Sequence, residues 1–141
     1  MVPAQFELVD NALTAEDFIR LKKAAGWLTD RPLKQVEKAL QNGLFNVCAL
    51  CEGKVVGMGR LVGDGAMYWY LQEIVVLPEY QGKGIGKAIV DRLLAHIRAS
   101  ALPGTQAHVG LIAVQGKEAF YERFGFTSIS TGMRQWLDID A

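Results

Sequence analysis

One segment of the sequence, a strand pattern that runs into a glycine-rich loop, constrains the fold more than any other. Residues 67–77 form a long apolar run with aromatic and β-branched side chains, and Pro78 ends it. Such a run is typical of a largely buried central strand. A glycine loop follows at residues 81–86, and apolar residues then recur at helical spacing over about 84–99. The segment therefore predicts a central strand, a loop and a long helix in succession.

The loop at residues 81–86 reads Gln-Gly-Lys-Gly-Ile-Gly, with glycine at alternate positions. Glycine adopts positive φ and lets a ligand approach the backbone closely. The loop also opens the helix, whose first N–H groups have no partner within the helix. Free N–H groups and the helix dipole favour an anion such as a pyrophosphate, and Lys83 and Lys87 add positive charge. The loop therefore predicts a phosphate-binding site, with a plain glycine-rich turn as the alternative.

Two other kinds of phosphate loop do not fit these residues. A Walker A loop has Gly-Lys followed by Ser or Thr, whereas Gly82 and Lys83 are followed by Gly84. The dinucleotide fingerprint has the spacing G-x-G-x-x-G in an early strand–helix unit, whereas this loop has G-x-G-x-G in mid-chain. A nucleotide-binding module that uses the loop for ATP or NAD stays open as a rival function.

The remaining pattern predicts seven strands and four helices in a single domain, residues 1–141. Apolar periodicity, glycine and proline place the strands at about 6–10, 45–52, 54–62, 67–77, 107–113, 126–129 and 133–139. They place the helices at about 14–25, 32–42, 84–99 and 116–124. The early strands meander, and the long helix crosses between a parallel pair. We expect an α/β (α+β) fold with a mixed, mostly antiparallel six- to seven-stranded sheet and helices on both faces.

Composition and charge exclude several classes of protein. The 141 residues suffice for one domain with a core, and the apolar content of 50% excludes a disordered chain. Basic and acidic residues number 15 each, so bulk charge indicates neither nucleic acid nor a membrane as a partner. Residues 1–7 lack the regions of a signal peptide, and no apolar run approaches the ~18 residues of a membrane helix. We therefore expect a cytoplasmic protein.

The two cysteines, Cys48 and Cys51, have the spacing C-x-x-C. This spacing allows a redox pair or half of a zinc site. The run 45–51 also has the pattern of a strand, in which residues three apart point to opposite faces. We therefore interpret both as reduced, small apolar residues, and we expect neither a metal site nor a covalent cysteine mechanism.

Two segments resemble one family. Residues 74–86, IVVLPEYQGKGIG, resemble the acetyl-CoA motif of the GNAT (Gcn5-related) N-acetyltransferase superfamily, in which a strand ending near V-x-P leads to [QR]-x-x-G-x-[GA]. Residues 119–126, AFYERFGF, are similar to the family's xFYxxxGF segment. The segments occur in the family's order, with a helix and a strand between them. The resemblance implies a GNAT-like fold over nearly the whole chain, with the fourth and fifth strands splayed apart.

The resemblance also implies acetyl-CoA as the acetyl donor. Its pantetheine arm would pair with the backbone of Ile74, Val75 and Val76, where one N–H would polarise the thioester carbonyl. Its pyrophosphate would lie at residues 81–87, which are Gln81, Gly82, Lys83, Gly84, Ile85, Gly86 and Lys87. Within that stretch, Ile85 is apolar and is expected in the core. Many members have asparagine where this chain has Val114, so Gln115 or Lys117 would replace its contact.

Two residues are candidates for proton transfer. Tyr121 matches the family tyrosine that protonates the departing thiolate, and its phenol, with a pKa near 10, suits a thiol of pKa ~8.5. Glu73 is the only carboxylate on the predicted fourth strand and could act as a base through water. Core packing is the alternative for Tyr121, and a structural acid is the alternative for Glu73. Strand alternation predicts Glu73 on the face opposite to Tyr70 and Gln72.

The acceptor is the least determined part of the prediction. Candidate acceptor-binding residues are Trp27, Trp69, Tyr70 and Gln72, and the family commonly builds its acceptor site in the segment that corresponds to residues 26–31. We expect His96 to pack or lie on the surface, and His108 is a minor candidate for ligand contact. An arginine could bind an acidic group, although solvated surface is expected for Arg60, Arg123 and Arg134.

The predicted function is acetyl-CoA-dependent N-acetyl transfer to a primary amine by direct attack. A small-molecule amine is favoured over a peptide amine, and amino sugars, polyamines, antibiotics and protein amines all remain open. A homodimer is possible. The alternative is a non-catalytic regulatory module that binds acyl-CoA, and the presence of Tyr121 argues against it.

Overall fold

The computed structural model describes residues 5–27, 31–129 and 131–140 of the chain. The chain divides into two units, residues 1–111 and residues 112–141, and each is described by itself. Two segments on which the predictions rest lie outside the described residues. They are residues 28–30, in the predicted acceptor segment, and residues 1–4, which were considered for a signal peptide. The single domain stays a prediction.

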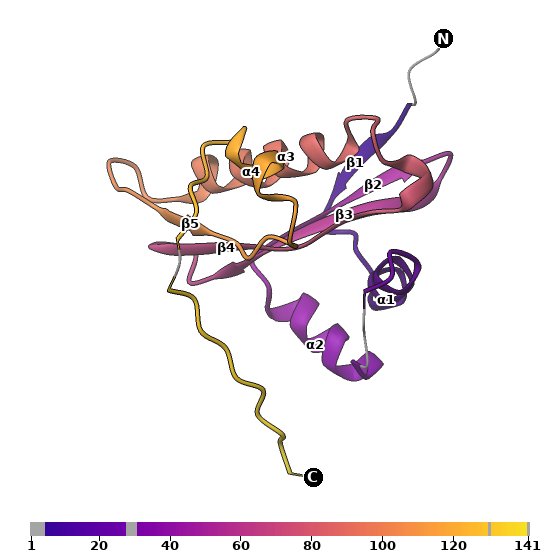
Figure 1. Ribbon diagram of the computed structural model, residues 1–141, viewed down its shortest axis with the longest axis horizontal. Helices are drawn as coiled ribbons and strands as arrows, with labels where there is room; N and C mark the ends of the chain where they lie inside the picture. The colour runs from indigo at the N-terminus through magenta and orange to yellow at the C-terminus, as the bar shows by residue number, and fades with distance from the viewer. Residues whose placement is uncertain (1–4, 28–30, 130, 141) are drawn as a thin grey trace. The chain divides into compact units, whose positions relative to one another are not determined.

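The first unit contains a sheet of five strands in the order β1-β2-β3-β4-β5 (Figure 1). Strands β1 to β4 pair antiparallel, and β4 pairs parallel with β5. The parallel pair is joined through the long helix, as predicted. The strands are β1 (Glu7–Asp10), β2 (Phe45–Cys51), β3 (Lys54–Gly63), β4 (Tyr68–Val76) and β5 (His108–Gly110).

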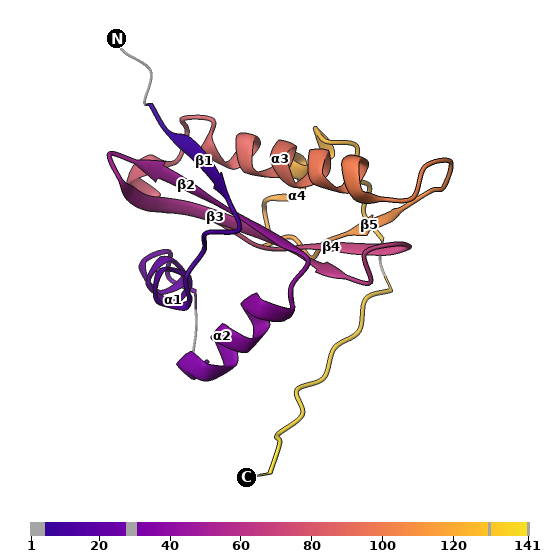
Figure 2. The ribbon, with the colours of Figure 1, turned by 180° about the vertical axis from the view of Figure 1, so that it is seen from behind.

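Helices cover both faces of this sheet, as predicted. Helices α1 (Ala15–Ala24) and α2 (Leu33–Asn42) lie on one face, and α3 (Ile85–Ser100) lies on the other (Figures 1 and 2). Thr14 caps α1, because its hydroxyl accepts a hydrogen bond of 3.1 Å from the Asp17 N–H. A short 3₁₀ helix, η1 (Pro78–Tyr80), connects β4 to the loop before α3.

Close packing joins α3 to the middle of the sheet. Helix α3 packs against β2, β3 and β4, and its residues Ile89 and Leu93 are fully buried. Gly59 of β3 permits this approach, because a Cβ atom there would lie 2.6 Å from Ile89 Cγ2 and 2.9 Å from Ile74 Cδ1. The same contacts place Gly59 and Ile74 on the α3 face.

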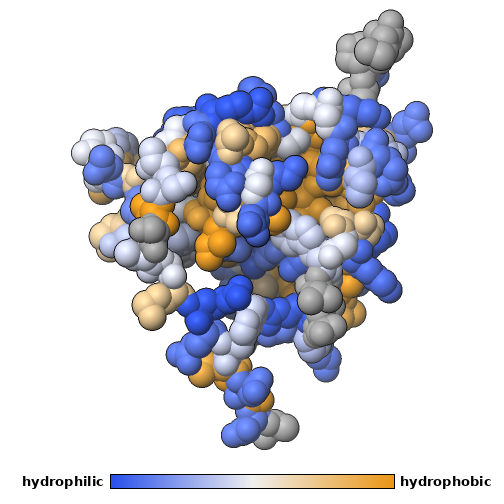
Figure 3. Space-filling model, viewed as in Figure 1, coloured by the Kyte–Doolittle hydropathy of each residue, from blue (hydrophilic) through white to orange (hydrophobic). Residues whose placement is uncertain are grey.

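The second unit contains helix α4 (Glu118–Glu122) and, among its described residues, no strand. The predicted strands at 126–129 and 133–139 are therefore wrong, and the sheet has five strands rather than six or seven. Met133 is 98% exposed, and hydrophobic and hydrophilic residues are mixed along the C-terminal segment (Figure 3). An alternation of apolar and polar residues is typical of a strand, but a strand also requires backbone hydrogen bonds to a neighbouring strand. The predicted strand at 107–113 is likewise shortened to the three residues of β5.

No helix within the described residues is long and apolar enough to cross a membrane.

Candidate active site

The glycine loop ends in the first turn of α3 with the backbone conformation that the sequence predicts. Gly82 has a φ of +77° and Gly84 a φ of +84°, both in the left-handed region that favours glycine. A Cβ atom at either position would meet nothing within 4 Å. Glycine is therefore required by the backbone angle and not by a lack of space for a side chain. Gly84 is the N-cap of α3, and no side chain caps the helix. The first N–H groups of this 16-residue helix are therefore available to an anion.

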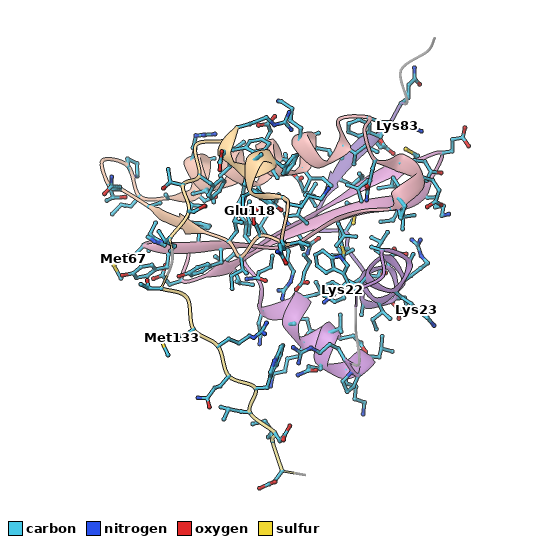
Figure 4. The ribbon with its side chains drawn as sticks, in the orientation of Figure 1. Lys22, Lys23, Met67, Lys83, Glu118 and Met133 are labelled. Carbon is cyan, nitrogen blue, oxygen red and sulfur yellow. The ribbon has the colours of Figure 1, made fainter. Side chains whose placement is uncertain are left out.

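Polar side chains surround the loop. Lys83 belongs to the loop (Figure 4), and its Nζ atom lies 5.3 Å from the centre of the Tyr80 ring. Lys87 pairs with Asp91 at 2.7 Å, and both side chains are more than half exposed. The Gln81 side chain donates a hydrogen bond of 3.0 Å to the Val76 carbonyl, which ties the loop to the end of β4. Gln81 is therefore placed to hold the loop in position.

Ile85, the first residue of α3, belongs to the core, as expected from its apolar side chain. It is 1% exposed, and its Cγ2 atom lies 3.2 Å from where a Cβ atom of Gly57 would be.

The edge of β4 is only partly paired. Strands β4 and β5 pair at three positions, from Tyr68 opposite His108 to Tyr70 opposite Gly110. Residues 71–76 have no strand partner on this side within the described part of the chain. The backbone N–H and C=O groups that point away from β3 can therefore pair with an extended ligand, as at other open sheet edges, although the Val76 carbonyl already accepts the hydrogen bond from Gln81. Ile74, Val75 and Val76 lie in this stretch, so the structure agrees with the predicted splay of the two strands.

A β-bulge lies in the same stretch of β4. Arg60 pairs with Gln72 and Met58 pairs with Val75, so two residues of β4 lie opposite Gly59 alone. Glu73 is one of them, with a φ of +54° that is uncommon for a residue other than glycine. A bulge interrupts the alternation of side chains and redirects them.

The bulge corrects the predicted orientation of Glu73. Its carboxylate contacts Arg60, which shares a face with Gln72 because directly paired residues of antiparallel strands project to the same side. Glu73 therefore lies on the same face as Gln72 and Tyr70, and the prediction of opposite faces is wrong. This is the face that α1 and α2 cover.

Three charged side chains meet on this face. Glu73 Oε2 lies 3.2 Å from Lys22 Nζ of α1, and Glu73 Oε1 lies 3.6 Å from Arg60 Nη2 of β3. The side chains are only 13% exposed for both cations and 15% for Glu73, so the expectation of solvated surface for Arg60 is wrong. Lys22 Nζ also lies 5.2 Å from the Phe18 ring centre and 5.7 Å from that of Trp27. Lys22 thus joins a predicted acceptor residue to the predicted base.

The aromatic residues predicted on β4 separate onto the two faces. Trp69 is 2% exposed and packs edge-on toward His96 of α3, so it is a core residue and does not line an acceptor site on the face of Glu73. Tyr70 is 39% exposed, and its ring lies against Gly110, where a Cβ atom would be 2.7 Å away. His108 lies 6.1 Å from the Tyr70 ring centre, which places this minor candidate beside a predicted acceptor residue.

The remaining histidine and both cysteines have the structural roles that the sequence predicts. His96 stacks on Phe45 with ring centres 3.9 Å apart. Cys48 and Cys51 are free thiols that are 0% and 8% exposed. Burial, aided by Asp17, raises the pKa of the Cys48 thiol to about 11, so it stays protonated and unreactive at neutral pH.

Tyr121 lies in α4 of the second unit. Its ring packs edge-on against Phe120 at 5.0 Å and Phe126 at 6.2 Å between centres. Burial raises the pKa of Tyr121, so the phenol carries its proton at neutral pH, as a general acid must. Lys117 is the N-cap of α4, and its N–H donates a 2.9 Å hydrogen bond to the Val114 carbonyl.

Sequence reasoning did not find Lys22 as a partner of Glu73. Lys22 and Glu73 are brought together by tertiary packing, and no local pattern marks such a contact. Arg60 was missed as well, because the register that continues from the turn at 63–65 pairs Arg60 with Gln72, and only the bulge brings Glu73 onto the same face.

Comparison with known proteins places these features in a family. Residues 42–128 match the acetyltransferase (GNAT) domain family, which covers more than half of the chain. The chain belongs to this family.

Individual relatives agree with this assignment. The uncharacterised N-acetyltransferase ycf52 of Pyropia yezoensis is 27% identical over 119 residues, and the match covers 82% of this chain and 66% of the relative. The chain thus spans just under two thirds of that relative's length. A probable acetyltransferase of unknown function from meticillin-resistant Staphylococcus aureus has a TM-score of 0.83 at 27% identity, covering 96% of this chain and 100% of the other. A GNAT family acetyltransferase from Brucella melitensis, solved in complex with acetyl-CoA, shares the fold at a TM-score of 0.65 and 21% identity, covering 94% and 92% of the two chains.

Proposed function

We propose that this chain transfers the acetyl group of acetyl-CoA to a primary amine by direct attack. One observation carries the proposal. The unpaired edge of β4 at residues 71–76 leads, through η1, to the uncapped N-terminus of α3. A ligand with an extended arm that leads to a pyrophosphate fits this order of strand edge and helix N-terminus. The strand edge can form hydrogen bonds with the arm, and the helix can donate N–H groups to the anion.

Acetyl-CoA is the ligand with that construction in this family. The backbone of Ile74, Val75 and Val76 would pair with the pantetheine arm, and residues 81–87 would hold the pyrophosphate. Gly82 and Gly84 support this assignment through their left-handed backbone, and Lys83 supports it through its charge. The structure of the Brucella relative was solved with acetyl-CoA, which also supports the assignment.

The proposed reaction moves two protons. The neutral amine attacks the thioester carbonyl carbon, and the carbon–sulfur bond breaks as the oxyanion collapses. The new amide loses its extra proton to a base, for which Glu73 is the proposed residue, directly or through water. The thiolate gains a proton from Tyr121, whose buried phenol is in the protonated form at neutral pH.

Thiol release tests the proposal. The purified chain would be mixed with acetyl-CoA and a panel of primary amines, and free coenzyme A thiol and acetylated amine would be measured together. We expect amine-dependent thiol release with the matching acetylated product. The rival function is a non-catalytic module that binds acyl-CoA. It predicts binding in calorimetry with no amine-dependent release across the panel, and that result would overturn the proposed activity.

The acceptor is proposed to be a small-molecule amine in preference to a peptide amine. Tyr70, Gln72 and Glu73 lie on the face of the sheet that α1 and α2 cover. Lys22 contacts both Glu73 and the ring of Trp27, so Trp27 lies near this face. A panel that contains both small amines and peptide amines would test the preference. Faster turnover of the peptides would reverse it.

A further inference from the structure

Lys22, Arg60 and Glu73, which we name the charge cluster, contain more hydrogen-bond donors than acceptors. A guanidinium has five N–H donors and an ammonium has three, whereas one carboxylate supplies the acceptors. Arg60 Nε is buried and has no hydrogen-bond partner within the described residues. The nearest approach of Arg60 to Glu73, 3.6 Å between Nη2 and Oε1, is an ion pair but too long for a hydrogen bond.

The described residues around the charge cluster do not supply the missing acceptors. Arg60 Nη1 lies near the C-terminus of α2, 3.4 Å from where a Cβ atom of Gly43 would be, and Lys22 lies in the last turn of α1. Each helix end contributes about half a negative charge at most, which favours a cation nearby. Within the described residues, neither helix end accepts a hydrogen bond from Arg60, and carbonyls in the last turn of α1 accept from the N–H groups of residues 25–27.

A mostly buried guanidinium with unpaired N–H groups destabilises the folded state unless an acceptor forms hydrogen bonds with those groups. Carboxylate and phosphate anions suit this requirement, because both accept paired hydrogen bonds from arginine. The two cations of the charge cluster contact Glu73, the proposed base, and so an anion held by them would be part of the molecule whose amine reacts.

We propose that the acetyl acceptor is an amine that also carries an anionic group, a carboxylate or a phosphate, and that Lys22 and Arg60 bind this group. The inference rests on the proposed acetyl transfer and narrows its acceptor to a chemical class. Glu73 holds the two cations at the site and faces the amine end of the same acceptor. Neutral amines lack the group that satisfies Arg60 and are the poorer acceptors.

Matched acceptors and matched variants test this inference. The first pair is tyramine and tyrosine, which differ by a carboxylate, and the second is ethanolamine and O-phosphoethanolamine, which differ by a phosphate. For each pair the readout is the ratio of kcat/KM for the anionic amine to that for the neutral one, measured by thiol release with the full chain. The two pairs show whether the site takes the carboxylate or the phosphate.

Three variants separate anion binding from general damage. We expect the ratio to exceed about 10 for at least one pair and to fall about tenfold in Arg60→Gln and Lys22→Gln, the change that follows loss of one charge-assisted contact. Arg60→Lys should retain part of the ratio. The matched control is Lys23→Gln, because Lys23 is exposed and lies on a different side of α1 from Lys22 (Figure 4), and it should keep the wild-type ratio. Partial unfolding lowers kcat/KM for both members of a pair by the same factor and so cancels in the ratio. The intrinsic reactivities of the two amines differ but are the same for every variant, so they cancel when the ratio of a variant is compared with that of the wild type.

Each outcome decides between the two proposals. Neutral amines that react as well as the anionic ones, or a ratio that survives Arg60→Gln and Lys22→Gln, would overturn the inference and leave acetyl transfer standing. Absence of thiol release with every amine would overturn the proposed function and the inference with it.

Discussion

At the scale of single residues, Gly84 has the most direct link to the proposed ligand. It takes a left-handed φ at the N-cap of α3, and a side chain there would meet no other atom within 4 Å. A β-branched residue in this conformation costs roughly 1–2 kcal/mol and is expected to adopt another backbone angle. That change would turn the first N–H groups of α3 away from a bound anion.

Gly84→Val should therefore lower the affinity for coenzyme A by about 100-fold, the loss that follows removal of two or more hydrogen bonds to a charged group. Calorimetric titration of the variant with coenzyme A measures this. Gly104→Val is the matched control, since Gly104 also has a positive φ, +80°, and open space around it, but lies after α3 and far along the chain from the loop. Equal affinity in Gly84→Val and Gly104→Val would refute the anion site.

Tyr121 tests the proton transfer at the same scale. Tyr121→Phe should lower kcat by about 100-fold, within the range for general acid catalysis, with little change in KM. Because burial raises the pKa of Tyr121 above its ordinary value of 10.0, the protonated acid persists through pH 9. Steady-state kinetics from pH 7 to pH 9 should show no loss of wild-type kcat from deprotonation of this residue. An unchanged kcat in Tyr121→Phe would remove Tyr121 from the mechanism.

At the scale of elements, the contact between α3 and β3 depends on a strand residue without a side chain. A methyl group at Gly59 would overlap Ile89 and Ile74. Gly59→Ala should therefore destabilise the fold by about 1–3 kcal/mol, the usual cost of overpacking a core. Chemical denaturation measures the difference. Gly132→Ala is the control, because nothing lies within 4 Å of its added Cβ and its effect should stay within about 0.5 kcal/mol. Equal stabilities of the two variants would contradict the packing described for α3.

His96 links α3 to β2 and adds a pH dependence. Burial lowers the pKa of His96 below 6.5, and the cation of Arg92 lowers it further, although Asp10 opposes this. The unfolded chain therefore binds a proton at a pH where the folded chain does not, so stability is complete above about pH 6.5 and declines as the pH falls toward the folded pKa. Thermal unfolding between pH 5 and pH 8 should show this decline, and His96→Phe should reduce it. An identical decline in the variant would assign it to other groups.

Prediction of elements from the sequence succeeded where local signals suffice. Thr14, Pro32 and Gly43 mark ends of α1 and α2, and the apolar stripe from Ile85 to Ile97 marks α3. The bulge at Glu73 has no such signal, because it arises from the pairing of β3 with β4, and it reversed the predicted face of the proposed base. The predicted C-terminal strands failed for the same reason, since alternation does not reveal whether a partner strand is present.

At the scale of the whole molecule, the two units contribute different parts of the proposed chemistry. The first unit holds the glycine loop, the open edge of β4 and the charge cluster, and the second unit holds Tyr121. The proposed donor site could be described from sequence because its motif is contiguous from β4 into α3. The proposed acceptor site could not be predicted, because Lys22, Arg60 and Glu73 come from three separate elements that only tertiary packing brings together.

The most direct test of the central claim, that the edge of β4 and the glycine loop bind acetyl-CoA, is a pair of calorimetric titrations of the full chain with acetyl-CoA and with ATP. Both ligands offer phosphates to the N-terminus of α3, but only acetyl-CoA adds an arm that can pair with residues 71–76. We expect saturable binding of acetyl-CoA at one site per chain and binding of ATP at least tenfold weaker. Binding of ATP as tight as that of acetyl-CoA, or no binding of acetyl-CoA, would contradict the proposed function.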